Sequence, residues 1–248
     1  MIYGVILAGG DRRLKESDLP MQYQTVGSKP ILLHTVEKFL LYGRIDKILV
    51  LCRREWIEKT EALLRESLGR GMERIQVIEG GATRNETIMR AIDFIDESGQ
   101  LDEDTLIVTH DALRPFVTRR IIEENVAAGL AHGMADTVLP ATDTIVCSED
   151  GKNIGSIPER SGMYQGQTPQ TFRAERLRQM YRELSAQQRE TLTDACKICK
   201  LQGETVYMVR GEVFNIKITY PYDLQVARSL LEEQCQSHKS AKVTNVTK

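Results

Sequence analysis

The 248-residue sequence lacks most of the features that would assign it to a special class of protein. Its apolar runs are shorter than the ~18 residues of a membrane-spanning helix, so we expect no membrane span. The first residues already form an apolar strand pattern, without the basic region of a secretory leader, which favours a cytoplasmic protein. The formal net charge of −2 gives no overall electrostatic basis for binding nucleic acid or an anionic membrane.

Cysteine is scarce and irregularly placed. The five cysteines are odd in number and scattered, which does not indicate a disulfide framework. Cys196 and Cys199 form one C-x-x-C, but a zinc site needs two further ligands, and no histidine is spaced near this pair. We interpret the segment as part of a helix, with metal or redox use as the weaker alternative.

Two well-known nucleotide motifs, G-x-x-x-x-G-K-[ST] and G-x-G-x-x-G, are also absent. Residues 5–23, VILAGGDRRLKESDLPMQY, nevertheless begin as a strand and continue into Gly9, Gly10 and a run of cations. Glycines let backbone N–H groups approach an anion, and arginine or lysine neutralises it. The segment therefore fits a phosphate pocket or, more simply, a strand–helix turn with surface charge.

Strand and helix patterns alternate along the first half of the chain. Each apolar strand pattern is followed by an amphipathic helix pattern, with the strands expected at residues 2–7, 47–51, 74–78 and 105–109. This alternation predicts an α/β fold, a Rossmann-like and mainly parallel sheet with helices on both faces. Ligands of such sheets bind beyond the carboxyl ends of the strands. Polar stretches follow strands at residues 9–15, 80–87 and 110–114, so we expect one shared site for an anionic ligand.

The pattern changes after residue 135. Short β-like pieces and irregular polar sequence predict a protruding β-arm at about residues 138–165, which covers the site, pairs with another subunit, or is a plain surface hairpin. Later elements are two helices, two strands and a last helix, at residues 173–184, 193–201, 205–209, 213–218 and 221–233. We predict one domain over residues 1–235 and a disordered tail over residues 236–248.

Several side chains near the predicted site are suited to phosphate chemistry. Asp111 ends a strand, where a carboxylate can hold Mg²⁺ together with substrate phosphates. Arg114 can bind a phosphate or, more simply, pair with Asp111. Lys217 lies in the last predicted strand, and a buried lysine needs a partner or a ligand. Arg160 reaches an anionic group if the arm folds over the site, and is otherwise a surface arginine.

Six segments together resemble the cytidylyltransferases that join CTP to a sugar-alcohol phosphate. They occur in the family's order and spacing over nearly the whole chain: LAGG at 7–10, PMQY at 20–23, GGATRNET at 80–87, HDALRP at 110–115, TPQ at 168–170 and NIKIT at 215–219. The stretches MYQGQTPQ, LTDACKIC and EVFNIKIT are most similar to the ribitol-5-phosphate enzymes of teichoic-acid and capsule synthesis. The enzymes that act on 2-C-methylerythritol 4-phosphate in isoprenoid synthesis are the next most similar group.

The resemblance implies a nucleotidyltransferase-type fold and a reaction. The phosphate of the acceptor, predicted to be D-ribitol 5-phosphate, attacks the α-phosphorus of CTP, giving CDP-alditol and pyrophosphate. Mg²⁺ is the implied cofactor, with Asp111 as its protein ligand. A homodimer is also implied, in which the arm carries Arg160 to the acceptor phosphate of the neighbouring subunit.

The resemblance further implies roles for individual residues. The catalytic residues are expected to be Arg13 at the triphosphate, Lys217 near the α-phosphate, and Lys15. The nucleotide-binding residues are expected to be Leu7, Ala8, Gly9, Gly10, Gly80, Gly81, Arg84, Thr87 and Asp111. The substrate-binding residues are expected to be Arg114, Arg160, Thr168 and Thr219.

The nucleotide loop departs from the family pattern at two positions. Asp11 follows Gly10 directly, without the family's next glycine, and its carboxylate stands where a triphosphate is expected. Met21 replaces the lysine of the family's Pro-Lys-Gln. Lys15 is the candidate substitute for that lysine. Two alternatives to the ribitol enzyme therefore stay open: the methylerythritol-phosphate enzyme, and a catalytically impaired homologue that still binds nucleotide.

Overall fold

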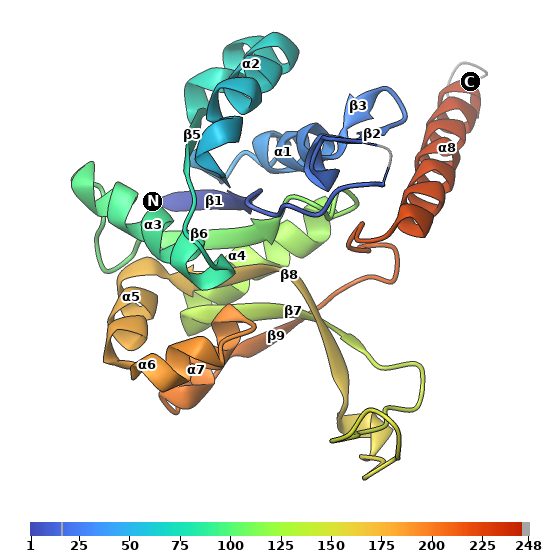
Figure 1. Cartoon of the computed structure of the whole chain (residues 1–248). Coiled ribbons are helices and arrows are strands. Elements are labelled where there is room, and N and C mark those ends of the chain that lie inside the picture. Colours follow the sequence, from blue (N-terminus) through green and yellow to red (C-terminus); the bar gives the residue numbers. More distant parts are fainter. Residues whose placement is uncertain (16, 245–248) are drawn as a thin grey trace.

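Seven strands form one mixed sheet in the order β5-β4-β1-β6-β8-β7-β9 (Figure 1). The computed structural model describes the backbone of residues 1–15 and 17–244, and side chains as far as residue 233. The strands are β1 (Ile2–Leu7), β4 (Lys47–Cys52), β5 (Ile75–Glu79), β6 (Leu106–Asp111), β7 (Met134–Pro140), β8 (Tyr164–Arg173) and β9 (Tyr207–Arg210). Neighbours from β5 to β6 are parallel, β8 is antiparallel to β6 and β7, and β9 is parallel to β7. The predicted α/β fold with a mainly parallel sheet is confirmed.

Helices cover both faces of this sheet because its strands are apolar on both faces. In β4, Ile48 and Val50 belong to one buried cluster and Leu49 and Leu51 to the other, as the alternation of side chains along a strand requires. The first cluster includes side chains of α1 (Ile31–Leu41), α2 (Ile57–Leu68) and α4 (Arg119–His132). The second cluster includes side chains of α3 (Arg84–Glu97), α5 (Ala174–Glu183) and α7 (Ala195–Leu201).

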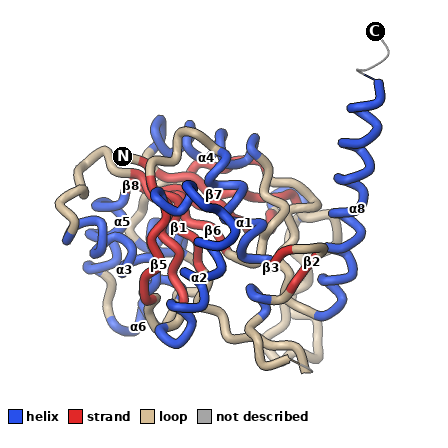
Figure 2. The backbone as a smooth tube through the Cα atoms, turned by 90° about the horizontal axis from the view of Figure 1, so that it is seen from above, coloured by secondary structure: helices blue, strands red, loops and turns tan. Residues whose placement is uncertain are grey.

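A third apolar cluster joins the start of the last helix, α8 (Pro221–Thr244), to the segment after β1. Met21, Val26 and Phe116 pack there against Leu224. The first turns of α8 lie beside β2 (Thr25–Val26) and β3 (Lys29–Pro30), which form a small antiparallel ribbon (Figure 2). The remaining short elements are η1 (Met21–Tyr23), η2 (Arg54–Trp56), η3 (Gly69–Arg74), η4 (Arg160–Gly162) and α6 (Ala186–Glu190).

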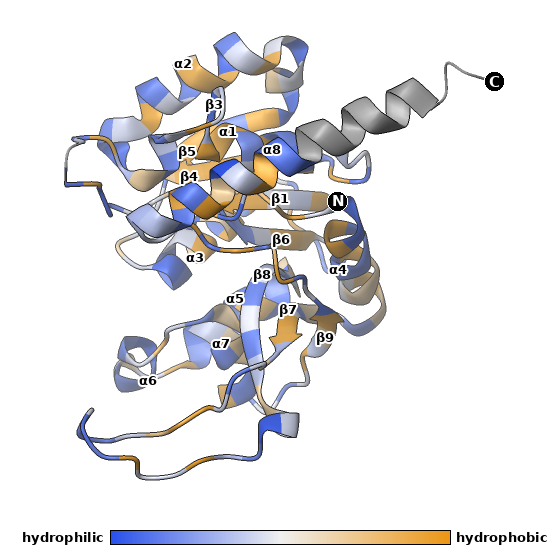
Figure 3. Ribbon diagram, turned by 90° about the vertical axis from the view of Figure 1, so that its right-hand side faces the viewer, coloured by the Kyte–Doolittle hydropathy of each residue, from blue (hydrophilic) through white to orange (hydrophobic). Residues whose placement is uncertain are grey.

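Between β7 and β8 the chain leaves the sheet as an arm. Residues 141–163 project from the body, and the hydropathy colouring shows apolar residues along them (Figure 3). The N–H of Ala141 donates to the carbonyl of Met163 over 2.9 Å at the base of the arm. Ile154 and Ile157 are 64% and 60% exposed. An arm is therefore present where the sequence predicts one, and its roles stay predictions.

Three elements differ from the sequence-based expectation. Residues 213–218, predicted as a strand, form a loop in which Val213 is exposed. Strand β8 lies where the sequence predicts irregular structure. The prediction is wrong because the polar side chains of this segment show no apolar alternation. Helix α8 continues to Thr244, so residues 236–244 are helical rather than disordered, whereas residues 245–248 of that predicted tail lie outside the described residues.

Within the described part of the chain, none of the helices combines the length and apolar character of a membrane span.

Candidate active site

A cavity of about 460 Å³ opens at the carboxyl ends of the parallel strands. The three polar stretches predicted to converge do so here. Its walls are formed by Leu7, Ala8, Gly9, Gly10, Asp11, Arg12, Gln22, Arg53, Gly81, Ala82, Thr83, Arg84, Thr87, Asp111, Ala112, Leu113, Lys217 and Thr219. Loops that are far apart in the sequence thus form one site, as expected for a sheet of this topology.

The loop after β1 is held in place by a buried glutamine. Gln22 is 2% exposed, and its Nε2 donates to the carbonyl oxygens of Ala8 and Gly10 over 2.7 and 2.8 Å. From the end of β4, Arg53 Nε donates to the carbonyl of Gly9 over 3.3 Å. These three hydrogen bonds fix the path of the glycine loop along the cavity.

The second wall is the turn into α3. Thr83 and Glu86 form a capping box at the first turn of this helix. The N–H of Gly81 donates to Thr87 Oγ1 over 3.0 Å. A Cβ on Gly81 would lie 2.5 Å from Glu86 Cβ, so this tight turn requires glycine. Gly80 lies behind the wall, with its N–H bound to the carbonyl of Cys52.

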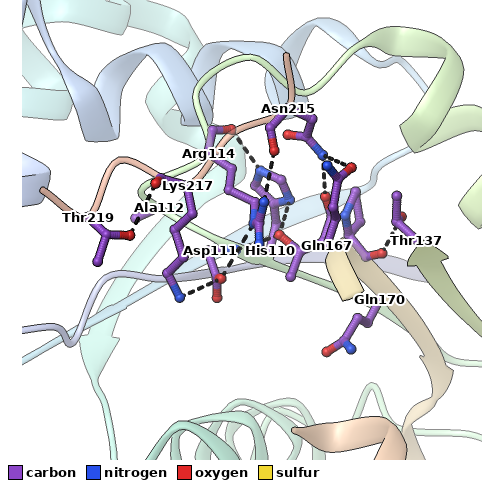
Figure 4. A network of polar contacts seen from close by, with 12 residues as sticks. His110, Asp111, Ala112, Arg114, Thr137, Gln167, Gln170, Asn215, Lys217 and Thr219 are labelled. Atoms are coloured by element: carbon purple, nitrogen blue, oxygen red, sulfur yellow. Dashed lines mark hydrogen bonds and ion pairs between the residues drawn. The ribbon is translucent and has the colours of Figure 1, made fainter. Parts of the chain in front are cut away.

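Asp111, at the end of β6, is surrounded by three cations, of which Arg114 and Lys217 are drawn in Figure 4 and the third is Arg84. Its Oδ2 lies 2.9 Å from Lys217 Nζ and 3.7 Å from Arg114 Nε, and its Oδ1 lies 3.3 Å from Arg84 Nε. Burial by itself would raise the pKa of Asp111, but the charges of Arg84 and Lys217 outweigh burial and hold the pKa below its usual range. The carboxylate is therefore ionised, and the cluster keeps a net positive charge that suits a polyphosphate.

The residues around Asp111 fit a Mg²⁺ ion that arrives with a nucleotide. Mg²⁺ needs one or two carboxylates and takes its other ligands from phosphates and water. Asp111 supplies one carboxylate, and its Oδ1 accepts a long 3.3 Å hydrogen bond from Arg84. A second group of potential metal ligands consists of Asp136, Asp194 and Cys196. The carboxylates of Asp136 and Asp194, however, already accept hydrogen bonds from Gln170 Nε2.

Behind Asp111, a buried network fixes the end of β6. His110 Nε2 lies 3.0 Å from the carbonyl of Arg114, which can only accept, so this nitrogen carries the proton. His110 Nδ1 then accepts from Thr168 Oγ1 over 2.8 Å, and Thr168 Oγ1 accepts from the N–H of Asp111. Burial lowers the pKa of His110 to about 4, so the ring is neutral. Thr168 thus orients the strand end that carries Asp111.

The same network positions the loop that carries Lys217. Arg114 donates to the carbonyl of Asn215 over 2.8 Å, and Asn215 Nδ2 donates to the carbonyl of Thr168 over 2.9 Å (Figure 4). Lys217 reaches Asp111 from this loop, with its side chain 42% exposed, and does not lie in a buried strand as predicted. Its Nζ is therefore accessible to a phosphate.

The structure brings most of the predicted site residues to the cavity. Those that line it are Leu7, Ala8, Gly9, Gly10, Gly81, Arg84, Thr87, Asp111, Lys217 and Thr219.

Other predicted site residues lie elsewhere. Arg114 and Thr168, predicted to bind the acceptor, are enclosed in the network behind Asp111. Arg13 and Lys15, predicted to be catalytic, are exposed residues that do not line the cavity. Arg160, in the arm, donates to the carbonyl of Thr142 over 3.1 Å and does not line the cavity of its own chain.

Two cations were missed by sequence reasoning. Arg53 follows β4 directly, so the rule about carboxyl ends could have found it. Arg12 lines the cavity next to Asp11, and its Nη1 donates to the carbonyl of Thr219 over 3.1 Å. Met21, at the position of the family lysine, is 1% exposed and packs in the third apolar cluster. Arg12 and Arg53 therefore supply cavity charge that Met21 does not.

Comparison with known proteins assigns the chain to a family. The family model of 2-C-methyl-D-erythritol 4-phosphate cytidylyltransferase (IspD) matches residues 2–233. The chain belongs to this family. It is accordingly a CTP-dependent cytidylyltransferase of the IspD family, and the predicted reaction class is confirmed. Every element that contributes to the cavity lies within the matched region.

Solved structures of IspD proteins share the whole fold. The 4-diphosphocytidyl-2C-methyl-D-erythritol synthase of Anaerococcus prevotii is 25% identical with a TM-score of 0.76, over 93% of this chain and 96% of that one. The 2-C-methyl-D-erythritol 4-phosphate cytidylyltransferase of Francisella tularensis is 26% identical with a TM-score of 0.75, over 91% and 97%. The corresponding Thermus thermophilus enzyme is 26% identical with a TM-score of 0.70, over 92% and 98%.

Proposed function

We propose that this IspD-family protein transfers the cytidylyl group of CTP to the phosphate of a small alditol phosphate. The observation that carries the proposal is the cationic cluster around Asp111, at the point where the glycine loop and the α3 turn meet. The acceptor phosphate attacks the α-phosphorus, a new P–O bond forms, and the bond to the β-phosphate oxygen breaks to release pyrophosphate. Catalysis then consists mainly of positioning and charge neutralisation.

The cavity walls suggest where each part of CTP lies. The α3 turn, with Gly81 and Thr87, suits the cytosine and ribose, because its backbone and hydroxyl groups can hydrogen-bond to them. The glycine loop, with Arg12 and Arg53, suits the β- and γ-phosphates. Lys217 Nζ, 2.9 Å from Asp111, suits the α-phosphate, whose charge grows in the transition state. A bound Mg²⁺ would supply further charge neutralisation of the triphosphate, with Asp111 as its protein ligand.

For the acceptor, the relatives favour 2-C-methyl-D-erythritol 4-phosphate. The matching family model and the similar solved structures carry the name of that activity. At 25–26% identity, the family can contain enzymes that act on other acceptors. We therefore place this compound first and test it against a second candidate.

D-Ribitol 5-phosphate, the acceptor predicted from the sequence, is the second candidate. One observation favours it, the polar cluster of Asp136, Gln170 and Asp194 beside Arg84. Gln170 Oε1 accepts from Arg84 Nη2 over 3.0 Å, and Gln170 Nε2 contacts both carboxylates. Burial raises the pKa of Asp136 to about 6. Carboxylates beside the cavity can accept hydrogen bonds from hydroxyl groups, and D-ribitol 5-phosphate has one more hydroxyl than 2-C-methyl-D-erythritol 4-phosphate and no methyl branch.

The test is release of pyrophosphate from CTP and Mg²⁺ with each acceptor at equal concentration. We expect release with one acceptor at a kcat/KM at least about 100-fold above the other, since enzymes distinguish acceptors by hydrogen bonds to their hydroxyl groups. A reaction without acceptor is the control. Calorimetric binding of CTP without turnover of either acceptor would instead support the impaired homologue suggested by Met21.

We further propose that the enzyme acts as a homodimer in which each arm completes the site of the other chain. The exposed Ile154 and Ile157 support this, because a protruding segment with apolar side chains is best stabilised by another surface. Arg160, which does not line the cavity of its own chain, would then serve the acceptor phosphate of the partner chain. The corresponding experiment is given in the Discussion.

A further inference from the structure

A carboxylate stands among the cations of the phosphate side of the cavity. Asp11 lines the cavity directly after Gly10. Its Oδ1 lies 3.1 Å from Arg13 Nη2, and its Oδ2 lies 3.2 Å from Arg53 Nη1. Each oxygen thus binds one guanidinium group, so one side chain joins an arginine of the glycine loop to an arginine that follows β4.

This arrangement resembles the way a phosphate group is held by two arginines. Guanidinium groups bind carboxylate and phosphate oxygens with the same geometry. The glycine loop leaves room for such an anion, because a Cβ on Gly9 would meet no atom within 4 Å. Arg53 is also tied to the loop through its bond to the carbonyl of Gly9, so its guanidinium stays near the position that a phosphate would take.

The two ion pairs of Asp11 are weak enough for a phosphate group to replace the carboxylate. The side chains of Asp11, Arg13 and Arg53 are 40%, 43% and 46% exposed, and pairs with this exposure contribute little net free energy. A triphosphate carries more charge than one carboxylate and can therefore displace it. A carboxylate that stays nearby also opposes the bound phosphates, because like charges at this range repel.

We propose that Asp11 is a positioning residue that takes the place of a phosphate. It holds Arg13 and Arg53 beside the cavity before nucleotide binds, yields them to the β- and γ-phosphates of the nucleotide, and binds them again as pyrophosphate leaves. The inference rests on the proposed function for the identity of the triphosphate. Asp11 thereby lowers the affinity for CTP and speeds the release of pyrophosphate. Arg13 takes part although it does not line the cavity.

The first experiment compares Asp11→Asn with the wild type by calorimetry, using CTP, inorganic pyrophosphate and cytidine as ligands. Removing the competing charge is expected to tighten binding of CTP and pyrophosphate about tenfold and to leave cytidine unchanged. In steady-state turnover, KM for CTP falls, and inhibition by pyrophosphate strengthens by the same factor. Asp18→Asn is the matched control, since Asp18 is an exposed acid of the same loop outside the cavity wall.

A double-mutant cycle identifies the arginine through which Asp11 acts. Arg53→Gln alone is expected to weaken binding of CTP and pyrophosphate about tenfold. In the Arg53→Gln background, Asp11→Asn should then tighten binding by much less than tenfold, because one of its two partners is gone. Equal effects of Asp11→Asn in both backgrounds would show that Asp11 does not act through Arg53. That result would overturn the proposal that Asp11 yields Arg53 to the phosphates.

Other outcomes are equally decisive. Unchanged pyrophosphate affinity in Asp11→Asn overturns the inference. So does a loss of CTP affinity that appears only with Mg²⁺, because Asp11 would then be a metal ligand. If no variant binds CTP but Asp11→Asn still tightens pyrophosphate, the inference stands and the proposed function fails. If neither protein binds CTP or pyrophosphate, both fail.

Discussion

The two halves of the sheet contribute to the site in different ways. In the half formed by β5, β4, β1 and β6, each strand is followed by its own loop and helix, and these loops directly line the cavity. In the half formed by β8, β7 and β9, side chains far apart in sequence meet through buried hydrogen bonds. The first half depends on local pattern, and the second depends on partners supplied by the tertiary structure.

The difference is visible in what each half buries. Val5, Ile6 and Val50 of the first half are fully buried and apolar, so any similar apolar residue satisfies the pattern. Thr137 and Gln170 of the second half are buried and polar, and each needs a matching partner. Thr137 Oγ1 accepts from Asn125 Nδ2 over 2.8 Å and donates to the carbonyl of Pro169. The second half is consequently less tolerant of single changes.

Asp111 joins the two halves, and changing it should give the largest effect. Asp111→Asn removes the carboxylate that pairs with Arg114 and Lys217, and it leaves Arg84 with the longer 3.9 Å ion pair to Asp194. We expect kcat to fall about 10³-fold and the free energy of unfolding to fall by about 3 kcal/mol. Turnover assays and urea denaturation measure the two effects.

The matched control for that change is Asp104→Asn, because the Asp104 side chain is 86% exposed and pairs with Arg173 at the surface. This variant should keep full activity and lose less than about 1 kcal/mol of stability. If Asp111→Asn behaved like the control, the two halves would be independent, contrary to the network described above.

Lys217 tests the contribution of the second half to chemistry without disturbing its packing. Lys217→Met should lower kcat about 10²- to 10³-fold, since one preorganised charge is lost at the α-phosphate. The side chain is 42% exposed, so thermal stability should stay close to that of the wild type. Lys200→Met, at a surface lysine bound to the carbonyl of Glu204, is the control. A kcat within a few-fold of the wild type would remove Lys217 from the mechanism.

The pH dependence of stability tests the buried network around His110. Its pKa is about 4 in the folded protein, against an ordinary value of 6.5, because the ring is buried. Between these values the unfolded chain binds the extra proton, so this contribution to stability falls as pH falls from about 6.5 to about 4. The stability of the wild type relative to His110→Gln should therefore drop by about 3 kcal/mol over this window.

The comparison with His110→Gln is needed because other groups titrate in the same range. Burial raises the pKa of Asp136 to about 6, and this change has the opposite sign. Asp136 is present in both proteins, so its effect cancels in the difference. Denaturation of both proteins at pH 7, 5.5 and 4 measures the drop, and a pH-independent difference would contradict the neutral, buried histidine.

The arm should give the smallest effect. Arg160→Ala is expected to raise KM for the acceptor about tenfold, because one exposed charge on a phosphate is lost, and to leave the affinity for CTP unchanged. If the arm serves the other subunit, mixing Arg160→Ala with Lys217→Met should restore activity, since one site of the mixed dimer is then complete. If the protein sediments as a monomer, or if mixing the two variants restores no activity, the site is formed by one chain alone.

The sequence predicted the first half of the molecule well. The strands β1, β4, β5 and β6 follow from short apolar runs, and the rule about carboxyl ends placed Gly10, Gly81 and Asp111 at one cavity. In the second half, β8 was missed because its polar residues and Pro169 do not show an apolar alternation. Lys217 was placed in a strand, although the segment is a loop held by Arg114 and Asn215.

By itself, the sequence indicated the α/β architecture and the edge of the sheet where the polar loops meet, because these depend on local periodicity. The reaction class followed from the resemblance of six short motifs to a known family. Only the tertiary structure decided the partners of the charged residues. It joined Asp111 to Arg84 and Lys217, Asp11 to Arg53, and Met21 to the apolar cluster under α8. The physical reason is that an ion pair depends on distances of 3–4 Å between residues far apart in the chain, which no local pattern encodes.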